Sequence, residues 1–547
     1  MPIYETTDSL PSLTYDFIVV GAGAAGSVLA HRLSEDANVT VLLLEAGPTY
    51  KEQPDLAIPS FCRIASPFTQ WDWKYMSTEQ KGLNRRVVPL PRGRVVGGST
   101  AINFMIYMQG SDDWNRLARE TGDDGWSWNK IRPYMKKNEK LIIPVDEPNP
   151  SGEIEPVELR RIGINYSQPC DERLLRASDE VRGGFAYSPS TSVNSGHPHG
   201  LTFWPTSIRD GTRSSAASAY LTPEVLARPN LHVLVNAHVA RVVPDVAPDG
   251  RISCKTVEYF LEGQQNHLLR ANAQKELILS AGAFATPAIL MRSGFGNKEQ
   301  LASIGIQHVK DVPELGKRMI DHPWLGITLT VDDKATADDG PLSAPVGNLF
   351  AQVRLPEDSF AIKKYGDTSA GKSTPNYFAA FCNGFFGPPR ESGNYLTVVI
   401  SLLTPISRGS LTITSADPLA APVIDCGYLT EEHDAAIYRT AIRDVAQVLR
   451  AEAWKGYVLG STLDSINLDD DAALDAYIRN GAMSLYHNVA TARMDTTSEG
   501  PGVVDRKLRV KDVDGLRIVD ASVLAPVYVA AERAADLIKS RWALNEM

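Results

Sequence analysis

The sequence predicts an α/β protein in which separated segments form one nucleotide-binding domain and the intervening material forms an α+β domain with a mixed sheet. Three observations support this prediction. A short apolar strand, a glycine-rich turn and a helix follow one another at 15–34. Two further apolar strands that run into small residues and a helix lie far downstream, at 276–282 and 516–520. Strands that alternate with helices favour a parallel sheet covered by helices.

The N-terminal unit has the pattern of a Rossmann-type dinucleotide-binding motif. Residues 15–20 form a β-branched apolar run, as expected for a buried parallel strand, and 24–34 carry helix-forming residues. Gly21, Gly23 and Gly26 between them have GxGxxG spacing. The first glycine permits a tight turn, the second lets backbone approach a pyrophosphate, and the third lets the helix pack on the strand. The helix N-terminus offers N–H groups and a positive dipole to phosphate oxygens.

An acidic residue stands where such a motif needs one. Residues 38–45 form a second buried strand that ends on Glu45, 19 residues after Gly26. A carboxylate at this point is placed to hold a ribose hydroxyl. The combination predicts a dinucleotide site, but it does not distinguish FAD from NAD.

Composition and charge argue against several partners. The 547 residues carry a formal net charge of −10, which disfavours a nucleic-acid partner because phosphate backbones are bound by an excess of Lys and Arg. No apolar run is long enough to span a bilayer. The five cysteines lack CxxC spacing, so neither a disulfide framework nor a metal site is expected. Residues 1–15 show no secretory signal, and an intracellular, cytoplasmic location is the expectation. The sequence does not indicate an oligomeric state.

Motifs over nearly the whole chain resemble those of the glucose-methanol-choline (GMC) oxidoreductases. Two glycine-containing segments, 92–103 and 282–296, carry the resemblance most strongly. Shorter matches follow the order of the family, at 71–73, 312–318, 321–322, 407–409, 417–418, 486–487, 502–505 and 520–522. The segment 525–532 is closest in wording to aryl-alcohol and hydroxymethylfurfural oxidases. The resemblance implies FAD as the cofactor and a small-molecule alcohol as the substrate.

The resemblance also implies positions for the cofactor. It places Gly98, Ser99 and Asn103 along the flavin and pyrophosphate, Val239 at the adenine, and the segment 520–521 over the ribityl chain. The full expected cofactor-binding set is Gly21, Gly23, Gly26, Glu45, Ala46, Gly98, Ser99, Asn103, Val239, Asp520 and Ala521. Some family members tether FAD through a His in the first glycine loop. Thr100, Ala101 and Ile102 stand there, so non-covalent FAD is expected.

Five segments divide between the two expected domains. Residues 1–155, 211–321 and 475–547 are assigned to the FAD-binding domain, and 156–210 and 322–474 to the substrate domain.

His487 matches the residue to which the family assigns the catalytic base. A base must take the hydroxyl proton while hydride leaves the carbinol carbon for flavin N5. The family usually has His-Pro-x-Gly-Thr at this point, whereas here Asn488 and Ala490 replace the turn-fixing Pro and the flexible Gly. The backbone beside His487 is therefore expected to differ from that of the family.

A larger departure follows Leu524. The family normally has a loop here that bears a second catalytic His or Asn, but Leu524 is followed directly by Ala525. Tyr486, Asn488 and Tyr528 are the candidates for a replacement partner. Three interpretations stay open: an enzyme with altered chemistry, a weakly active or inactive relative, and a gene model that lacks a short coding piece.

The leading hypothesis is an FAD-dependent oxidase or dehydrogenase that converts a primary aromatic or allylic alcohol to the aldehyde. Its electrons would pass to O2 or to another acceptor. One alternative is a hydroxynitrile-lyase-like enzyme that holds FAD without using it for redox chemistry. The other is a flavin-binding protein with little or no activity.

Overall fold

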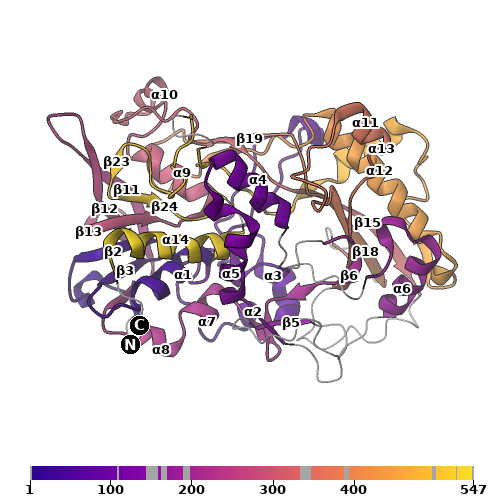
Figure 1. Cartoon of the computed structure of the whole chain (residues 1–547), viewed down its shortest axis with the longest axis horizontal. Coiled ribbons are helices and arrows are strands. Elements are labelled where there is room, and N and C mark those ends of the chain that lie inside the picture. Colours follow the sequence, from indigo (N-terminus) through magenta and orange to yellow (C-terminus); the bar gives the residue numbers. More distant parts are fainter. Residues whose placement is uncertain are drawn as a thin grey trace.

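The computed structural model describes residues 3–107, 110–142, 158–161, 169–188, 198–332, 347–386, 393–495, 500–524 and 526–544. Two large β-sheets dominate these ranges and lie at opposite ends of the molecule (Figure 1). The N-terminal strands and the C-terminal helix share the left-hand part of that view, so the two ends of the chain contribute to the same half of the fold.

The first sheet joins strands from distant parts of the chain. Its order is β1 (Ile3–Tyr4), β10 (Leu231–Leu234), β3 (Val41–Leu44), β2 (Thr14–Val20), β13 (Leu269–Leu279), β12 (Ile252–Leu261) and β11 (Ala237–Val246). In addition, β24 (Leu516–Ile518) pairs with β13, and β23 (Val513–Asp514) pairs with β12. β2 and β24 both run parallel to β13, which pairs Leu277 with Ile18 and with Leu516. The predicted assembly of one parallel sheet from three separated units is confirmed.

Helices cover this sheet and join its distant strands. α1 (Ala24–Leu33) packs against α14 (Val527–Trp542), the C-terminal helix, and an ion pair joins Arg32 to Glu532. α9 (Gly282–Arg292) follows β13, as the sequence predicts. Arg517 on β24 forms a fully buried ion pair with Glu276 on β13, with Nε–Oε2 and Nη2–Oε1 distances of 2.6 and 2.8 Å. This pair fixes the strand that leads into Asp520.

The second sheet, at the right of Figure 1, is built mainly from the middle of the chain. Its order is β21 (Val458–Ser461), β15 (Pro323–Val331), β18 (Tyr395–Leu402), β17 (Tyr377–Asn383), β16 (Gly347–Val353) and β6 (Gly200–Phe203), with β22 (Met483–Ser484) also beside β15. α12 (Glu432–Leu449) packs on β17 and β18, and α13 (Asp471–Gly481) packs on β15. The α/β class with an α+β second part is confirmed.

The second sheet differs from the prediction in one detail. Its strand pairs within the described ranges are all antiparallel, so the sheet is not mixed. The strands β16, β17 and β18 follow one another in the chain without an intervening crossover, and strands connected in this way pair antiparallel. One strand also crosses the expected domain division, because β22 lies within 475–547 but pairs with β15. The domain boundaries themselves stay a prediction.

Smaller elements complete the described part of the chain. A three-stranded sheet of β14 (Lys317–Met319), β19 (Gly409–Thr412) and β20 (Val423–Asp425) leads from the first large sheet towards the second. The other helices are α2 (Pro54–Ala57), α3 (Cys62–Ala65), α4 (Ser111–Thr121), α5 (Trp128–Asn138), α6 (Pro169–Val181), α7 (Ala216–Tyr220), α8 (Pro223–Leu226), α10 (Lys298–Ser303) and α11 (Phe360–Tyr365). The other strands are β4 (Lys140–Ile142), β5 (Glu158–Arg161), β7 (Pro205–Thr206), β8 (Ile208–Arg209) and β9 (Thr212–Arg213).

None of the helices in these ranges has both the length and the apolar character that a membrane crossing requires. All five cysteines are buried free thiols.

Candidate active site

A cavity of about 1880 Å³ is bounded by residues from both large sheets. At one end it meets the ends of β2 and β3 and the start of α1, and at the other it meets one face of the second sheet. The predicted site residues that line it are Gly21, Gly23, Glu45, Ala46, Gly98, Ser99, Asn103, Val239, His487, Asp520 and Ala521. Gly26 does not line the cavity. The fold therefore brings together, in one space, residues that come from five distant parts of the sequence.

The three glycines of the N-terminal turn have different surroundings. Gly21 has a φ of +98°, which a residue with a side chain rarely adopts. A Cβ on Gly26 would lie 1.8 Å from the carbonyl oxygen of Gly21, so this glycine is required by packing alone. A Cβ on Gly23 would approach nothing in the protein closer than the Cα of Gly98, at 3.9 Å. Only a ligand that approaches the backbone would require the second glycine to lack a side chain.

The N-terminus of α1 fits a phosphate group. Its N-cap, Gly23, makes no side-chain capping bond, and Gly21, Gly23, Ala24 and Ala25 all face the cavity. Backbone N–H groups at a helix N-terminus bind anions well, and they usually receive a capping side chain where no ligand is bound. The second glycine loop lies against the first, because a Cβ on Gly98 would come within 2.7 Å of the Cα of Gly23. The two loops together form a cradle that suits the pyrophosphate of a dinucleotide.

Glu45 lies at the nucleotide end of this cradle. Its Oε2 accepts a hydrogen bond from the N–H of Ala22 and its Oε1 accepts one from Gly47, both at 2.8 Å. A carboxylate has about four acceptor positions, so room remains for a ribose hydroxyl. Burial raises the pKa of Glu45 to about 7.

The side chain of Asp520 has a structural role. Its Oδ2 accepts from the N–H of Gly282 (2.8 Å) and from Thr286 Oγ1 (2.6 Å) on α9, and its Oδ1 accepts from the N–H and the hydroxyl of Ser522 (2.8 and 2.5 Å). These four bonds use the acceptor capacity of the carboxylate. A cofactor would therefore meet the backbone of 520–521 rather than this side chain.

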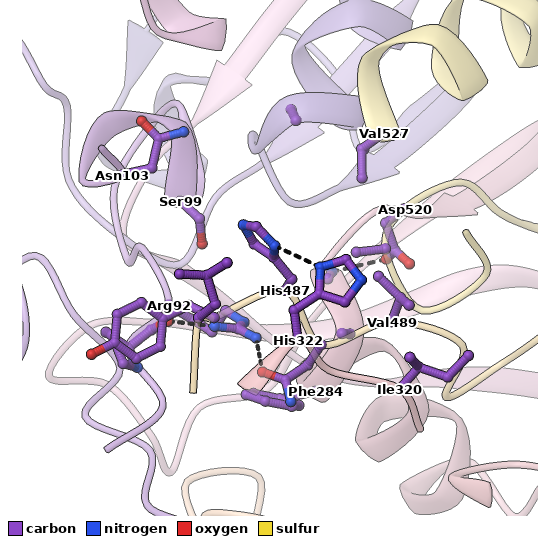
Figure 2. A pocket seen from close by; sticks show the side chains of 18 of the residues that line it. Arg92, Ser99, Asn103, Phe284, Ile320, His322, His487, Val489, Asp520 and Val527 are labelled. Atoms are coloured by element: carbon purple, nitrogen blue, oxygen red, sulfur yellow. Dashed lines mark hydrogen bonds between the residues drawn. The ribbon is translucent and has the colours of Figure 1, made fainter. Parts of the chain in front are cut away.

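The side chain of Asn103 is also partly engaged by the protein. Its Oδ1 accepts from the N–H of Met105 at 3.0 Å and from Arg213 Nη1 at 2.9 Å. Its amide N–H groups remain as the donors that could reach a flavin. Ser99 and Asn103 lie on the same side of the cavity in Figure 2, above Arg92.

The structure places a second histidine beside His487. Ile320 and Val489 form an antiparallel bridge, with N–O distances of 3.1 and 2.9 Å, and the N–H of Leu485 donates to the carbonyl of His322 at 2.9 Å. These bonds bring the segments around 322 and 487 side by side. The two Nδ1 atoms lie 3.1 Å apart, and the ring planes cross at 78° (Figure 2).

One buried carboxylate, Asp321, positions both histidines. Its Oδ1 accepts the backbone N–H groups of His322 (2.9 Å) and His487 (2.8 Å). Its Oδ2 accepts from Ser484 Oγ at 2.6 Å and from the Tyr428 hydroxyl. With both backbone donors on the same oxygen, the separation of the two rings depends on this single side chain.

Both imidazoles are neutral at physiological pH. The pKa of His487 is lowered to about 3, first by burial and then by the nearby His322 and Arg92. The side chain is open to the cavity, but the protein surrounds it closely enough that a charged ring would be poorly solvated. Burial also lowers the pKa of His322. A neutral ring is the form that can accept a proton.

None of the three partners proposed from the sequence bonds to the ring of His487 within the described residues. The Oδ1 of Asn488 accepts from Arg92, whose guanidinium lies 4.4 Å above the ring of Phe284. The Tyr528 ring stacks on Tyr220, with centroids 6.0 Å apart. Tyr486 lines the cavity without a side-chain bond to His487.

Sequence analysis missed His322 as the neighbour of His487. It lies in the segment 321–322, which carries part of the family resemblance but received no role. An adjacent Asp and His in a chain that lacks the usual second partner was the available signal. Ala525, at the predicted gap, lies outside the described residues, and α14 begins at Val527.

The substitutions beside His487 leave strained backbone. Ala490 has a φ of +68°, in the left-handed region, where the resemblance implies a Gly. Ala490→Gly should stabilise the protein by about 0.5–1 kcal/mol, since relief of about 1–2 kcal/mol of strain is partly offset by the entropy that Gly adds to the unfolded chain. Urea-induced unfolding measures this. Ala492→Gly is the matched control and should destabilise, because Ala492 is fully buried and has no positive φ. Equal destabilisation by both substitutions would contradict the prediction.

The fold and the cavity define a dinucleotide-binding protein with a histidine pair beside the cofactor cradle. Sequence models described as GMC oxidoreductase match residues 15–324 with the N-terminal part of the family and residues 405–532 with the C-terminal part. The chain therefore belongs to the GMC oxidoreductase family and is an FAD-dependent oxidoreductase.

Similar proteins include dehydrogenases and oxidases. Dehydrogenase eriK from Hericium erinaceus is 38% identical over 98% of this chain and 96% of its own length. Pyranose dehydrogenase 3 from Leucoagaricus meleagris is 34% identical over 99% and 95% of the two chains. The crystal structure of a formate oxidase superposes with a TM-score of 0.86 at 26% identity, over 97% of this chain and 99% of that one. A fungal aryl-alcohol oxidase has a TM-score of 0.82 at 25% identity, over 97% and 99%.

Proposed function

We propose that this chain oxidises a primary aromatic or allylic alcohol to the aldehyde, with His487 as the base and with non-covalently bound FAD. One observation carries the proposal: a neutral imidazole faces the cavity beside the residues expected to hold the flavin. No partner among the described residues occupies Nε2 of His487, so that nitrogen is left for a substrate hydroxyl.

The roles of the residues follow from their positions. Bound FAD would supply flavin N5 as the acceptor of the hydride. Nε2 of His487 takes the hydroxyl proton, and Asp321 holds the backbone of His487 in place. The residues Ser99 and Asn103 lie on the wall where the flavin is expected. Thr100, Ala101 and Ile102 offer no imidazole for a covalent link, which supports non-covalent binding.

The second sheet supports an apolar substrate. The face of that sheet towards the cavity carries Trp324 on β15, Val399 on β18, and Phe378, Ala380 and Cys382 on β17. Alternate residues of a strand share one face, so this row is a continuous apolar wall. An aromatic or allylic group would pack on it, whereas the hydroxyl groups of a pyranose would lose water there without full replacement. Electrons would then pass to O2 or to another small acceptor.

Anaerobic mixing of the FAD-bound protein with alcohols tests the proposal. Benzyl or cinnamyl alcohol should bleach the flavin absorbance, and glucose should do so at least about tenfold more slowly at equal concentration. Failure of a broad alcohol panel to bleach the flavin would overturn the proposed function. Cyanohydrin cleavage with the flavin still oxidised would favour the lyase alternative instead. After precipitation with trichloroacetic acid, the flavin should remain in the supernatant, and a yellow pellet would contradict non-covalent binding.

The rate of flavin reduction should change little between pH 8 and about pH 5. His487 must be neutral to act as a base, and its lowered pKa of about 3 keeps it neutral over this range, whereas an unperturbed His would be lost below 6.5. Stopped-flow bleaching at a saturating alcohol concentration measures the profile. The unfolded chain takes up this proton near its ordinary pKa, which lowers stability in acid, so only conditions that retain bound FAD are compared. An inflection near 6.5 would contradict the assignment.

A further inference from the structure

The contact between His322 and His487 has a direction that the rest of the structure determines. Its Nδ1–Nδ1 distance of 3.1 Å is that of a hydrogen bond between two ring nitrogens. A neutral imidazole carries one N–H and one acceptor nitrogen, so one of the two rings must donate and the other must accept.

The carbonyl of Leu403 decides which ring accepts. The ring of His322 also bonds to the backbone of Leu403, and this bond favours the protonated ring, so His322 is the donor and the carbonyl the acceptor. Because Nδ1 of His322 faces His487, the nitrogen that donates to Leu403 is Nε2. A neutral His322 with its proton on Nε2 presents a lone pair at Nδ1.

The same rule then applies to His487. Its Nδ1 faces a lone pair and must carry the proton, which leaves Nε2 as the acceptor nitrogen. Nε2 is the atom without a protein partner, on a ring that is open to the cavity. The chain of bonds from Leu403 through His322 to His487 therefore delivers a lone pair to the place where a substrate would lie.

We propose that His322 is the positioning residue of this active site: it holds His487 in the tautomer whose Nε2 is free to accept the substrate proton. This inference rests on the proposed function for its catalytic meaning. His322 acts through His487, so it does not replace the contact with the substrate oxygen that the family assigns to its second His or Asn. It supplies orientation from the strand before β15 in a chain that lacks the usual C-terminal loop.

His322 also supports the protonated state of the base. When Nε2 takes the hydroxyl proton, the O–H bond breaks, an N–H bond forms and the imidazole becomes a cation. The bond from its Nδ1–H to His322 is then charge-assisted and stronger than before. Asp321 keeps the two rings at this separation, since it accepts the backbone N–H of both residues.

A spectroscopic experiment tests the tautomer without reference to activity. In FAD-bound protein labelled with ¹⁵N-histidine, Nε2 of His487 should resonate as an unprotonated nitrogen and Nδ1 as a protonated one, with the signals assigned by their loss in His487→Asn. In His322→Leu the two nitrogens should exchange. In His322→Asn, the side-chain oxygen can accept from Nδ1 and should restore the wild-type pattern. A protonated Nε2 in the wild-type protein would overturn the inference, even if the Leu variant failed to fold.

Kinetics give the second measurement. His322→Leu should lower the rate constant of flavin reduction about 10²- to 10⁴-fold, with KM changed less than about threefold, and His322→Asn should recover most of the loss. His267→Leu, on an exposed turn, is the matched control and should leave the rate unchanged. A rate for His322→Leu within about twofold of wild type would overturn the inference. If the wild-type flavin is not bleached but the predicted tautomer is observed, the proposed function fails and the positioning role stands.

Discussion

Replacing His487 by Ala is expected to lower the rate constant of flavin reduction about 10²- to 10⁴-fold, the loss that follows removal of a general base. The ring is the group with a free acceptor nitrogen at the centre of the site, and Asp321 and His322 are arranged to hold it there. Its backbone bonds would survive the substitution, because Asp321 contacts the N–H of residue 487 rather than its side chain. Stopped-flow bleaching under anaerobic conditions measures the rate.

The FAD content of His487→Ala should equal that of the wild type, since the cradle around Gly23 and Gly98 is untouched. His267→Ala serves as the control for loss of an imidazole elsewhere on the protein. The truncated side chain leaves a space that opens on the cavity, so added imidazole should restore part of the rate. Full activity of His487→Ala would show that another group accepts the proton.

Local patterns explain why the nucleotide end of the site could be predicted. The strand, turn and helix from 14 to 33 are adjacent in sequence, and the roles of Gly21, Gly23 and Gly26 depend only on contacts within this unit and with Gly98. The burial of strands 276–279 and 516–518 was visible as apolar runs, and the helix that follows each run supported their place in one parallel sheet.

The chemical end of the site depends on contacts that no local pattern records. His322 and His487 are 165 positions apart, and their meeting requires that the chain enters and leaves the second sheet at one point. The tautomer depends on the carbonyl of Leu403, and a backbone carbonyl has no signature in a sequence. Asn488 illustrates the same limit: its replacement of Pro was visible, but its bond to Arg92 was not.

Asp520 shows that family resemblance can place a segment without giving the role of a side chain. The motif put 520–521 over the cofactor, and both residues do line the cavity. The carboxylate nevertheless holds α9 and Ser522 through four hydrogen bonds, which only the packed structure reveals.

Two substitutions at neighbouring glycines should have opposite consequences. Gly23→Ala should leave folding almost unchanged, because its methyl group meets no protein atom closer than 3.9 Å. It should weaken FAD binding about 10- to 100-fold, since the methyl group would separate the pyrophosphate from the backbone and remove one or two charged hydrogen bonds worth roughly 1.5–3 kcal/mol each. Gly26→Ala should destabilise the fold itself by about 3 kcal/mol or more, because its methyl group would overlap the carbonyl oxygen of Gly21.

Unfolding with and without added FAD separates the two effects. FAD stabilises only the folded state, so it should raise the unfolding midpoint of the wild type. In Gly23→Ala the midpoint without FAD should match the wild type and the increase with FAD should be much smaller. In Gly26→Ala the midpoint without FAD should already be low. Gly250→Ala provides a control at a positive φ of +83° with nothing within 4 Å, and it should keep the full FAD-dependent increase. Normal FAD binding by Gly23→Ala would place the pyrophosphate somewhere other than the N-terminus of α1.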